Sequence, residues 1–114
     1  MTSVSTHILD TTRGRPAAGV PVALDTWADG DWQRLGESVT GADGRTRALP
    51  TFDPPAPPGR AACRLVFAVG DYLVAHHGAA FFPEITVAFA AAPGEHYHVP
   101  LLLTPYGYSV YRGS

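Results

Sequence analysis

The sequence predicts an all-β domain, a sandwich of strands packed around one core. Short alternating or apolar runs recur along the chain, and clusters of Gly, Pro and Asp separate them, which is the pattern of a β-sandwich. The chain of 114 residues has the usual size of one domain. Hydrophobic residues make up 46% and charged residues only 16%, so we expect a single domain over residues 1–114 that buries part of its surface in an oligomer.

Seven runs have the composition of strands. In the second run Val22 and Leu24 fall on one face while Ala23 and Asp25 fall on the other, which is alternation with a period of two. Residues 28–31 are typical of a hairpin turn into the next run. The predicted strands cover residues 3–9, 20–28, 32–40, 63–69, 85–91, 96–103 and 107–112.

Two segments are not predicted to be strands. Between Asp43 and Arg60 the chain contains prolines that cannot donate ladder hydrogen bonds, so we expect an ordered loop there. These prolines are Pro50, Pro54, Pro55, Pro57 and Pro58. Residues 71–78 are predicted to form one helix of about two turns, with Asp71 as the N-cap and Gly78 near the C-terminal end.

Charge and composition exclude several kinds of partner. All eight basic residues are Arg, they are scattered along the chain, and the formal net charge is -2. No stripe of positive charge can follow a phosphate backbone, so nucleic acid is not an expected partner. The N-terminus lacks a secretory signal and no run approaches the ~20 apolar residues of a membrane span, so we expect a cytoplasmic location. The only cysteine, Cys63, lies in an apolar run and is expected to be buried.

The residues best suited to chemistry are histidines on predicted strands. In residues 96–103, alternation directs the apolar side chains toward the core and His96 and His98 toward the opposite face. His7 also points away from the core in the first run. Because histidine titrates near neutral pH, two of them on one exterior face could share general-base and general-acid roles. From parity alone, solvated histidines without a function are the favoured interpretation.

Other histidine patterns have their own interpretations. His76 and His77 lie near the end of the predicted helix, where the helix dipole favours an imidazolium, so they need no function. The spacing of His96 and His98, with His7 as a third ligand, would suit a metal ion. No carboxylate or cysteine lies beside them in the sequence, so metal binding is a minority interpretation.

Arg45 is a candidate for binding an oxygen of a substrate. It follows Asp43 and Gly44, a turn signal, so we expect it to open the next strand at a fixed position. Its planar guanidinium can hold a carbonyl or an anionic oxygen through paired hydrogen bonds. Arg47 has the same parity, so the choice between the two arginines stays open at this point.

Five blocks, in order along nearly the whole chain, resemble the 5-hydroxyisourate hydrolases. The blocks are Thr6 to Asp10, Asp43 to Arg45, Phe82 to Ile85, His96 to Leu102 and Tyr111 to Ser114. The Tyr-Arg-Gly-Ser ending is the most discriminating of them, because transthyretins, the related non-catalytic carriers of thyroid hormone, lack it. Thr104 and Val110 depart from the family pattern, and neither replaces an acid-base group.

The resemblance implies a transthyretin-like (prealbumin-like) sandwich of two antiparallel sheets with one short helix. It implies a homotetramer with active sites in a channel between subunits. The implied reaction opens the ring amide of 5-hydroxyisourate to give 2-oxo-4-hydroxy-4-carboxy-5-ureidoimidazoline in urate breakdown, with no cofactor and no metal. By position, the family's catalytic residues fall on His7, Arg45, His98 and Ser114, and Arg45, Tyr111 and Ser114 would bind the substrate.

A mechanism consistent with these groups uses one histidine, His7 or His98, to take a proton from the attacking water. The other histidine or a second water would protonate the departing ring nitrogen, while Arg45 stabilises the charge on oxygen. The sequence does not divide the roles between the histidines, and it leaves the role of His96 open. Gly113 permits a bend that could bring Ser114 into the same pocket.

Two other classes of protein compete with this interpretation. One is a non-catalytic carrier that binds a small aromatic ligand in the same channel. The joint presence of His7, Arg45, His98 and the Tyr-Arg-Gly-Ser ending argues against a carrier. The other is a structural or adhesive sandwich module, a class that is usually secreted, and the expected lack of a signal peptide argues against it.

Overall fold

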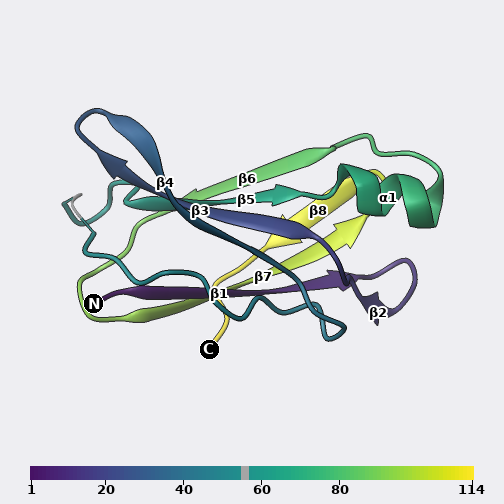
Figure 1. Cartoon of the computed structure of the whole chain (residues 1–114), viewed down its shortest axis with the longest axis horizontal. Coiled ribbons are helices and arrows are strands. Elements are labelled where there is room, and N and C mark those ends of the chain that lie inside the picture. The colour runs from purple at the N-terminus through teal and green to yellow at the C-terminus, as the bar shows by residue number, and fades with distance from the viewer. Residues whose placement is uncertain (55–56) are drawn as a thin grey trace.

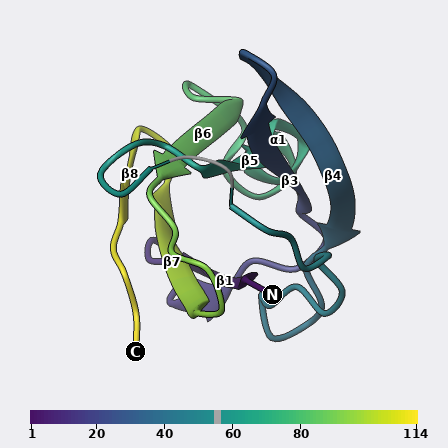
Figure 2. The same cartoon turned by 90° about the vertical axis from the view of Figure 1, so that its left-hand side faces the viewer.

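The computed structural model describes residues 1–54 and 57–114, which form a two-layered sandwich with one short helix at one end (Figure 1). The elements are β1 (Ser3–Asp10), β2 (Arg15–Pro16), β3 (Pro21–Ala28), β4 (Asp31–Val39), β5 (Cys63–Ala68), α1 (Gly70–His77), β6 (Glu84–Phe89), β7 (His96–Thr104) and β8 (Gly107–Val110). One sheet has the strand order β2-β1-β7-β8 and the other β4-β3-β5-β6. Viewed from the end, the two sheets form separate layers (Figure 2).

The expected sandwich is confirmed, but one strand pairing differs from the expected antiparallel arrangement. β1 runs parallel to β7, with Ser3 beside His96 at one end and Asp10 beside Leu103 at the other. The other pairings within the described residues are antiparallel. A parallel pair needs a long crossover connection, here the whole second sheet, so no local turn signal could predict it. The pairing brings the first and the last long strands together at the centre of one sheet.

The core lies between the two sheets and is built from alternating residues of the central strands. Ile8 and Leu101 are fully buried on one sheet, and Leu24 and Phe67 are fully buried on the other. Burying one such side chain contributes about 1.5–3 kcal/mol. Cys63 is also buried, as expected, and burial raises the pKa of its thiol to about 12.

The short connections agree in part with the sequence prediction. The predicted hairpin turn is confirmed, since Asp29 and Gly30 have φ values of 54° and 79°, as a type I′ turn requires.

The two-residue strand β2 was not predicted, because two residues carry no alternation. The last strand was predicted to continue to residue 112 but ends at Val110.

The predicted helix is confirmed, but it begins one residue earlier than expected. Val69 is the N-cap residue rather than Asp71, and no side-chain hydrogen bond caps this end. Asp71 lies in the first turn instead, where its negative charge still interacts favourably with the helix dipole. Gly78 ends the helix in the left-handed conformation, with φ of 79°. No helix in the described part of the chain is long and apolar enough to cross a membrane.

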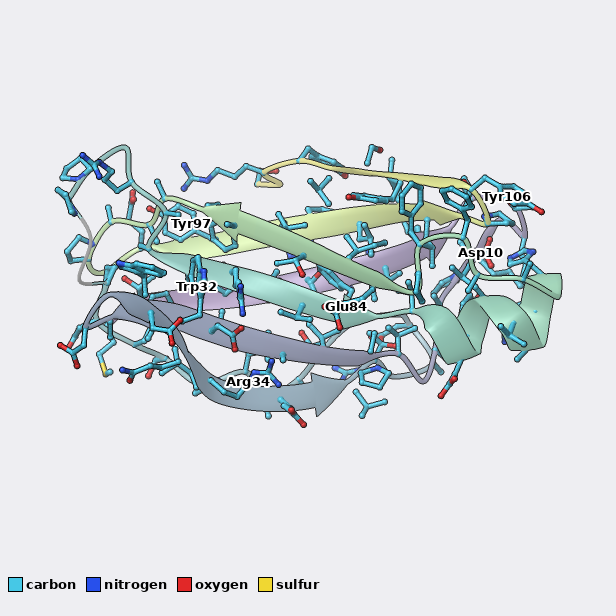
Figure 3. The ribbon with its side chains drawn as sticks, turned by 90° about the horizontal axis from the view of Figure 1, so that it is seen from above. Asp10, Trp32, Arg34, Glu84, Tyr97 and Tyr106 are labelled. Atoms are coloured by element: carbon cyan, nitrogen blue, oxygen red, sulfur yellow. The ribbon has the colours of Figure 1, made fainter. Side chains whose placement is uncertain are left out.

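A buried carboxylate connects the helix to the first sheet. Asp10 lies at the helix end of the sandwich (Figure 3) and accepts hydrogen bonds from the Tyr72 hydroxyl at 2.8 Å and from Nε2 of His77 at 2.7 Å. Burial alone would raise the pKa of Asp10, but the hydrogen bonds from His77, the Arg13 amide and Tyr72 together hold it below its ordinary value. His77 is therefore a structural contact, not only a histidine placed in the field of the helix dipole.

The proline-containing segment runs alongside β1. Phe52 is buried and exchanges backbone hydrogen bonds with Thr2, with N–O distances of 2.9 and 3.0 Å. This contact agrees with the prediction of an ordered loop for the part of the segment that is described. Pro55, which that prediction included, lies outside the described residues.

Candidate active site

The outer face of the central strands β1 and β7 carries the candidate acid-base residues. In the parallel register, Ser3, Ser5 and His7 lie beside His96, His98 and Pro100, respectively. Burial alternates along β1 and along β7 from His96 to Val99: His7 and His98 are half-buried and His96 is exposed, while Thr6 and Tyr97 are buried. The prediction that the three histidines point away from the core is therefore confirmed. The pairing of the two strands then collects them on one surface.

Arg45 reaches this surface from a loop that lies along β1. It forms an isolated antiparallel bridge with His7. The amide of Ile8 donates to the carbonyl of Gly44 at 2.9 Å, and the amide of Arg45 donates to Oδ1 of Asp43 at 3.0 Å. Arg45 thus occupies a fixed position, as predicted, but as a single bridge residue rather than as the first residue of a strand.

Gly44 allows this close approach. Its φ is 77°, a conformation that side chains disfavour, and an added Cβ would lie 2.4 Å from the carbonyl oxygen of Ile8. Only glycine can therefore place the loop directly against β1. The motif that resembled a turn signal in the sequence also holds Arg45 beside His7.

The structure also shows which of the two candidate arginines, Arg45 or Arg47, lies near the histidines. Nη2 of Arg47 lies 2.9 Å from Oδ2 of Asp43, in an exposed ion pair. Arg45, by contrast, lies close enough to His98 for its charge to affect the titration of that histidine. Of the two arginines, Arg45 is the one that belongs to the histidine surface.

His98 lies in an environment that favours its neutral form. Burial lowers the pKa of His98, and the nearby charges of Arg45, His7 and His96 lower it further. A neutral imidazole is the form that accepts a proton from water, so this environment suits a general base.

Two serines connect His96 and His98. The Ser3 Oγ lies 2.6 Å from Nδ1 of His96, and the Ser5 Oγ lies 2.9 Å from Nε2 of the same ring. The Ser5 Oγ also lies 2.8 Å from Nδ1 of His98. Alternation along β1 puts both serines on the same face as His7, but sequence reasoning missed these contacts, because the parallel register that creates them has no local signal.

The geometry does not support the minority interpretation of a metal site. Nε2 of His96 and Nδ1 of His98 face each other, and each is hydrogen-bonded to the Ser5 hydroxyl. Across residues 1–54 and 57–114, no group of three or more His, Cys, Asp or Glu side chains is arranged to hold a metal ion. His7, His96 and His98 therefore do not form the ligand set that their spacing had indicated.

The C-terminus runs past His98. The amide of Gly113 donates to the carbonyl of His98 at 2.7 Å, and an added Cβ on Gly113 would lie 2.8 Å from Cδ2 of the His98 ring. Tyr111, two residues before Gly113, and Ser114, the residue after it, are exposed. No hydrogen bond among the described residues joins either side chain to the histidines or to Arg45. The structure thus brings the chain end to His98, without direct contacts from the two predicted substrate-binding side chains.

A separate cavity of about 330 Å³ opens between the two sheets at the edge formed by β6 and β8. Its lining includes Val87, Phe89, Val110 and Arg112. It lies behind the histidine surface and contains no histidine or carboxylate, so it offers no group that accepts a proton near neutral pH.

Known proteins match the chain over almost its full length. A model of the HIUase/Transthyretin family matches residues 4–113. A 5-hydroxyisourate hydrolase of Salmonella dublin is 46% identical over 112 residues, covering 97% of this chain and 80% of that protein. The solved structure of the Klebsiella pneumoniae 5-hydroxyisourate hydrolase matches with a TM-score of 0.78 at 34% identity and covers all of both chains. The transthyretin of Sparus aurata matches with a TM-score of 0.83 at 29% identity, over 96% of this chain and 95% of that one.

Proposed function

Because the chain belongs to the HIUase/Transthyretin family, we propose that the surface formed by His7, Arg45 and His98 is the site at which it hydrolyses 5-hydroxyisourate in urate degradation. The observation that carries the assignment is the parallel register of β1 and β7. This register places His98 beside Ser5, one step along the face from His7, to which Arg45 is bridged.

The reaction opens a ring amide and yields 2-oxo-4-hydroxy-4-carboxy-5-ureidoimidazoline. His98 acts as the general base, since its lowered pKa keeps it neutral and able to take a proton from the attacking water. His7 returns a proton to the departing ring nitrogen. Arg45 donates hydrogen bonds to the carbonyl oxygen as it gains negative charge. A proton acceptor, a proton donor and an oxygen-binding cation are sufficient for this hydrolysis.

The chain end completes the substrate site. Gly113 is held against His98, so Tyr111, two residues before it, and Ser114, the residue after it, are within reach of a molecule bound there. The Ser114 hydroxyl and the terminal carboxylate can orient the attacking water or an imidazole, and Tyr111 offers a ring and a hydroxyl to the substrate.

The functional form is a homotetramer in which this surface lines a channel between subunits. Two features support the proposal: the catalytic groups lie outside the core of their own subunit, and His96 is exposed in the single chain. A facing subunit would exclude water and strengthen the electrostatic contribution of Arg45. The cytoplasmic location stays a prediction, which cell fractionation would test.

A carrier of small ligands is the alternative function, and the fold does not separate it from the enzyme, since a transthyretin and a hydrolase both match the chain closely. The acid-base residues favour the enzyme. The test follows the ultraviolet absorbance of freshly generated 5-hydroxyisourate with wild-type protein, with His98→Gln and without protein. We expect rapid decay with wild type alone. Binding of the compound without faster decay would support the carrier.

A further inference from the structure

We infer that Ser5 and His96 are positioning residues that hold the proton of His98 on Nδ1 and take over the positive charge that His98 gains during the reaction. The inference rests on the proposed role of His98 as the general base. It gives a function to His96, which lies outside the group of residues proposed to touch the substrate. It also gives a reason for the serine that separates the two rings.

A serine hydroxyl has one proton, and this fact couples the two histidines. The Ser5 Oγ lies within hydrogen-bonding distance of both Nε2 of His96, at 2.9 Å, and Nδ1 of His98, at 2.8 Å. The hydroxyl can donate to one of these nitrogens and must accept from the other. When both rings are neutral, one of the two facing nitrogens therefore carries a proton and the other does not.

Two arrangements of protons satisfy all three contacts. In the first, His98 donates from Nδ1 to Ser5, and Ser5 donates to Nε2 of His96. His96 then donates from Nδ1 to Ser3, at 2.6 Å. This arrangement leaves a lone pair on Nε2 of His98, as a base requires. In the second arrangement every donor and acceptor is exchanged, and His98 presents an N–H that cannot accept a proton.

The charge of Arg45 favours the first arrangement. Arg45 lies close enough to lower the pKa of His98, and a positive charge attracts a lone pair and repels the positive end of an N–H bond. Arg45 is bridged to His7, and both lie beyond His98 in one direction along the strands. His96 lies beyond His98 in the opposite direction.

The same contacts can carry positive charge away from His98. When Nε2 of His98 takes a proton from water, the ring becomes an imidazolium. Its Nδ1 proton then moves to the Ser5 Oγ while the Ser5 proton moves to Nε2 of His96, so that two bonds to hydrogen break and two form. His98 ends neutral, Ser5 is restored and His96 carries the charge. The charge has moved away from Arg45, from His98 to the ring on the far side of Ser5.

The first test is the position of the proton on His98 in the resting full-length protein, read from the ¹⁵N chemical shifts of its ring. We expect the proton on Nδ1 in wild type. In Ser5→Ala it should move to Nε2, the usual position in a free imidazole, and in Ser5→Thr it should return to Nδ1. Ser3→Ala is the matched control, on the same strand and face, and should leave the proton on Nδ1. This measurement needs no substrate, so it separates the inference from the proposed function.

The second test is turnover of freshly generated 5-hydroxyisourate. Ser5→Ala should lower kcat about 10- to 100-fold, as loss of a partner that orients a functional histidine does, and Ser5→Thr should restore most of it. KM should change less than about threefold, because Ser5 does not touch the substrate. His96→Gln can still accept a hydrogen bond from Ser5 but cannot take a proton, so it should keep the proton of His98 on Nδ1 and still lower kcat.

Either of two results would overturn the inference. One is a proton on Nε2 of His98 in the resting wild-type protein. The other is wild-type kcat in folded Ser5→Ala or, should that variant fail to fold, in His96→Gln, whose substitution lies at an exposed position. Absence of turnover by the wild-type protein itself would instead refute the proposed function and leave the ring measurement valid.

Discussion

The histidines of this chain differ in what their ring nitrogens contact. His77 is bound through Nε2 to the buried carboxylate of Asp10, a contact that joins the helix to the sheet. His98 is bound through Nδ1 to the hydroxyl of Ser5, which leaves Nε2 for water or substrate. The first histidine is suited to stabilising the fold and the second to moving protons, although both have the same side chain.

Substitution of the proposed acid-base pair tests the site directly. His7→Gln and His98→Gln should each lower kcat by about 10²- to 10⁴-fold, the usual contribution of a positioned proton-transfer group. His76→Gln is the control, because His76 is exposed on the helix and packs on Tyr72, with 4.4 Å between ring centroids. Absorbance assays on all three variants check the prediction. Near-normal turnover by both His7 and His98 variants would refute the site.

The lowered pKa of His98 predicts the acid limit of activity. Its ordinary value is 6.5 and the folded protein holds it lower, so the neutral base should survive as the pH falls below 6.5. The acid limb of kcat/KM, which reports the free enzyme, should therefore lie below pH 6.5. A profile measured from acid to neutral pH checks this, and an acid limb centred above 6.5 would contradict it.

The lowered pKa of His98 also predicts how the stability of the fold depends on pH. As the pH falls below 6.5, the unfolded chain takes up a proton at His98 before the folded protein does, so acid should destabilise the fold through this residue. Above that pH both states are neutral there and the effect vanishes. Chemical denaturation at several pH values should show a weaker acid dependence for His98→Gln than for wild type.

His77 should matter for stability rather than for turnover. Replacing it by Ala removes a hydrogen bond to a fully buried carboxylate, which should lower the free energy of unfolding by about 1–3 kcal/mol. His76→Ala, one residue earlier on the exposed side, should cost less. Urea denaturation of the two variants measures the difference, and equal losses would show that the contact with Asp10 contributes nothing.

At the scale of strands and helices, alternation and turn chemistry were readable from the sequence. Burial with a period of two placed His7 and His98 outside the core before any partner strand was known, because alternation is a local property of one strand. The turn at Asp43 and Gly44 likewise indicated a fixed position for Arg45. The helix start is placed wrongly because Asp71 is a good capping residue by type, whereas the observed N-cap residue is Val69, two residues earlier.

Pairing between strands could not be read in the same way. The contacts of Ser5 with His96 and His98 depend on the register of two strands that lie at opposite ends of the chain. The alternation within one strand does not indicate which other strand it pairs with or in which register. The position of Gly113 against His98 depends on the same sheet, which is why the site could be predicted as a set of residues but not as an arrangement of contacts.

The chain end offers a test at this scale. A Cβ on Gly113 would lie 2.8 Å from the His98 ring, so Gly113→Ala must displace either the ring or the chain end. We expect kcat to fall about 10- to 100-fold, since a displacement of about 1 Å can cost that much. Gly107→Ala is the matched control, because a Cβ there makes only an ordinary contact with Thr104, at 3.6 Å. Equal kcat in the two variants would contradict the role of the chain end.

An extension after Ser114 should act on the same contact. A C-terminal affinity tag should lower turnover more than an N-terminal one, with melting temperature and assembly close to those of the untagged protein. A parallel loss of assembly would show that the ending serves subunit contacts instead.

At the scale of the whole molecule, the proposed site and the sheet edges are both open in the single chain. Phe81 and Phe82 are exposed beside β6, and Phe82 stacks edge-on against exposed Tyr108 of β8, with 5.6 Å between ring centroids. An exposed edge strand with apolar neighbours is a surface that proteins usually cover. These features agree with the proposed tetramer.

Sedimentation equilibrium should therefore report a tetramer, and turnover per subunit should fall when dilution dissociates it. Loss of the facing subunit would admit water to His98 and Arg45 and weaken their electrostatic contribution. A stable monomer with full activity would refute the channel between subunits.

The parallel pairing of β1 with β7 also has a kinetic consequence. The contact between Ser3 and His96 joins residues 93 positions apart, so its formation closes a loop that contains almost the entire chain. Closing so long a loop is entropically costly, and folds rich in such contacts acquire their structure slowly. Hairpins of the other sheet can form earlier from neighbouring segments. Proton transfer between these strands requires this closure, so recovery of catalysis during refolding should report the pairing of β1 with β7.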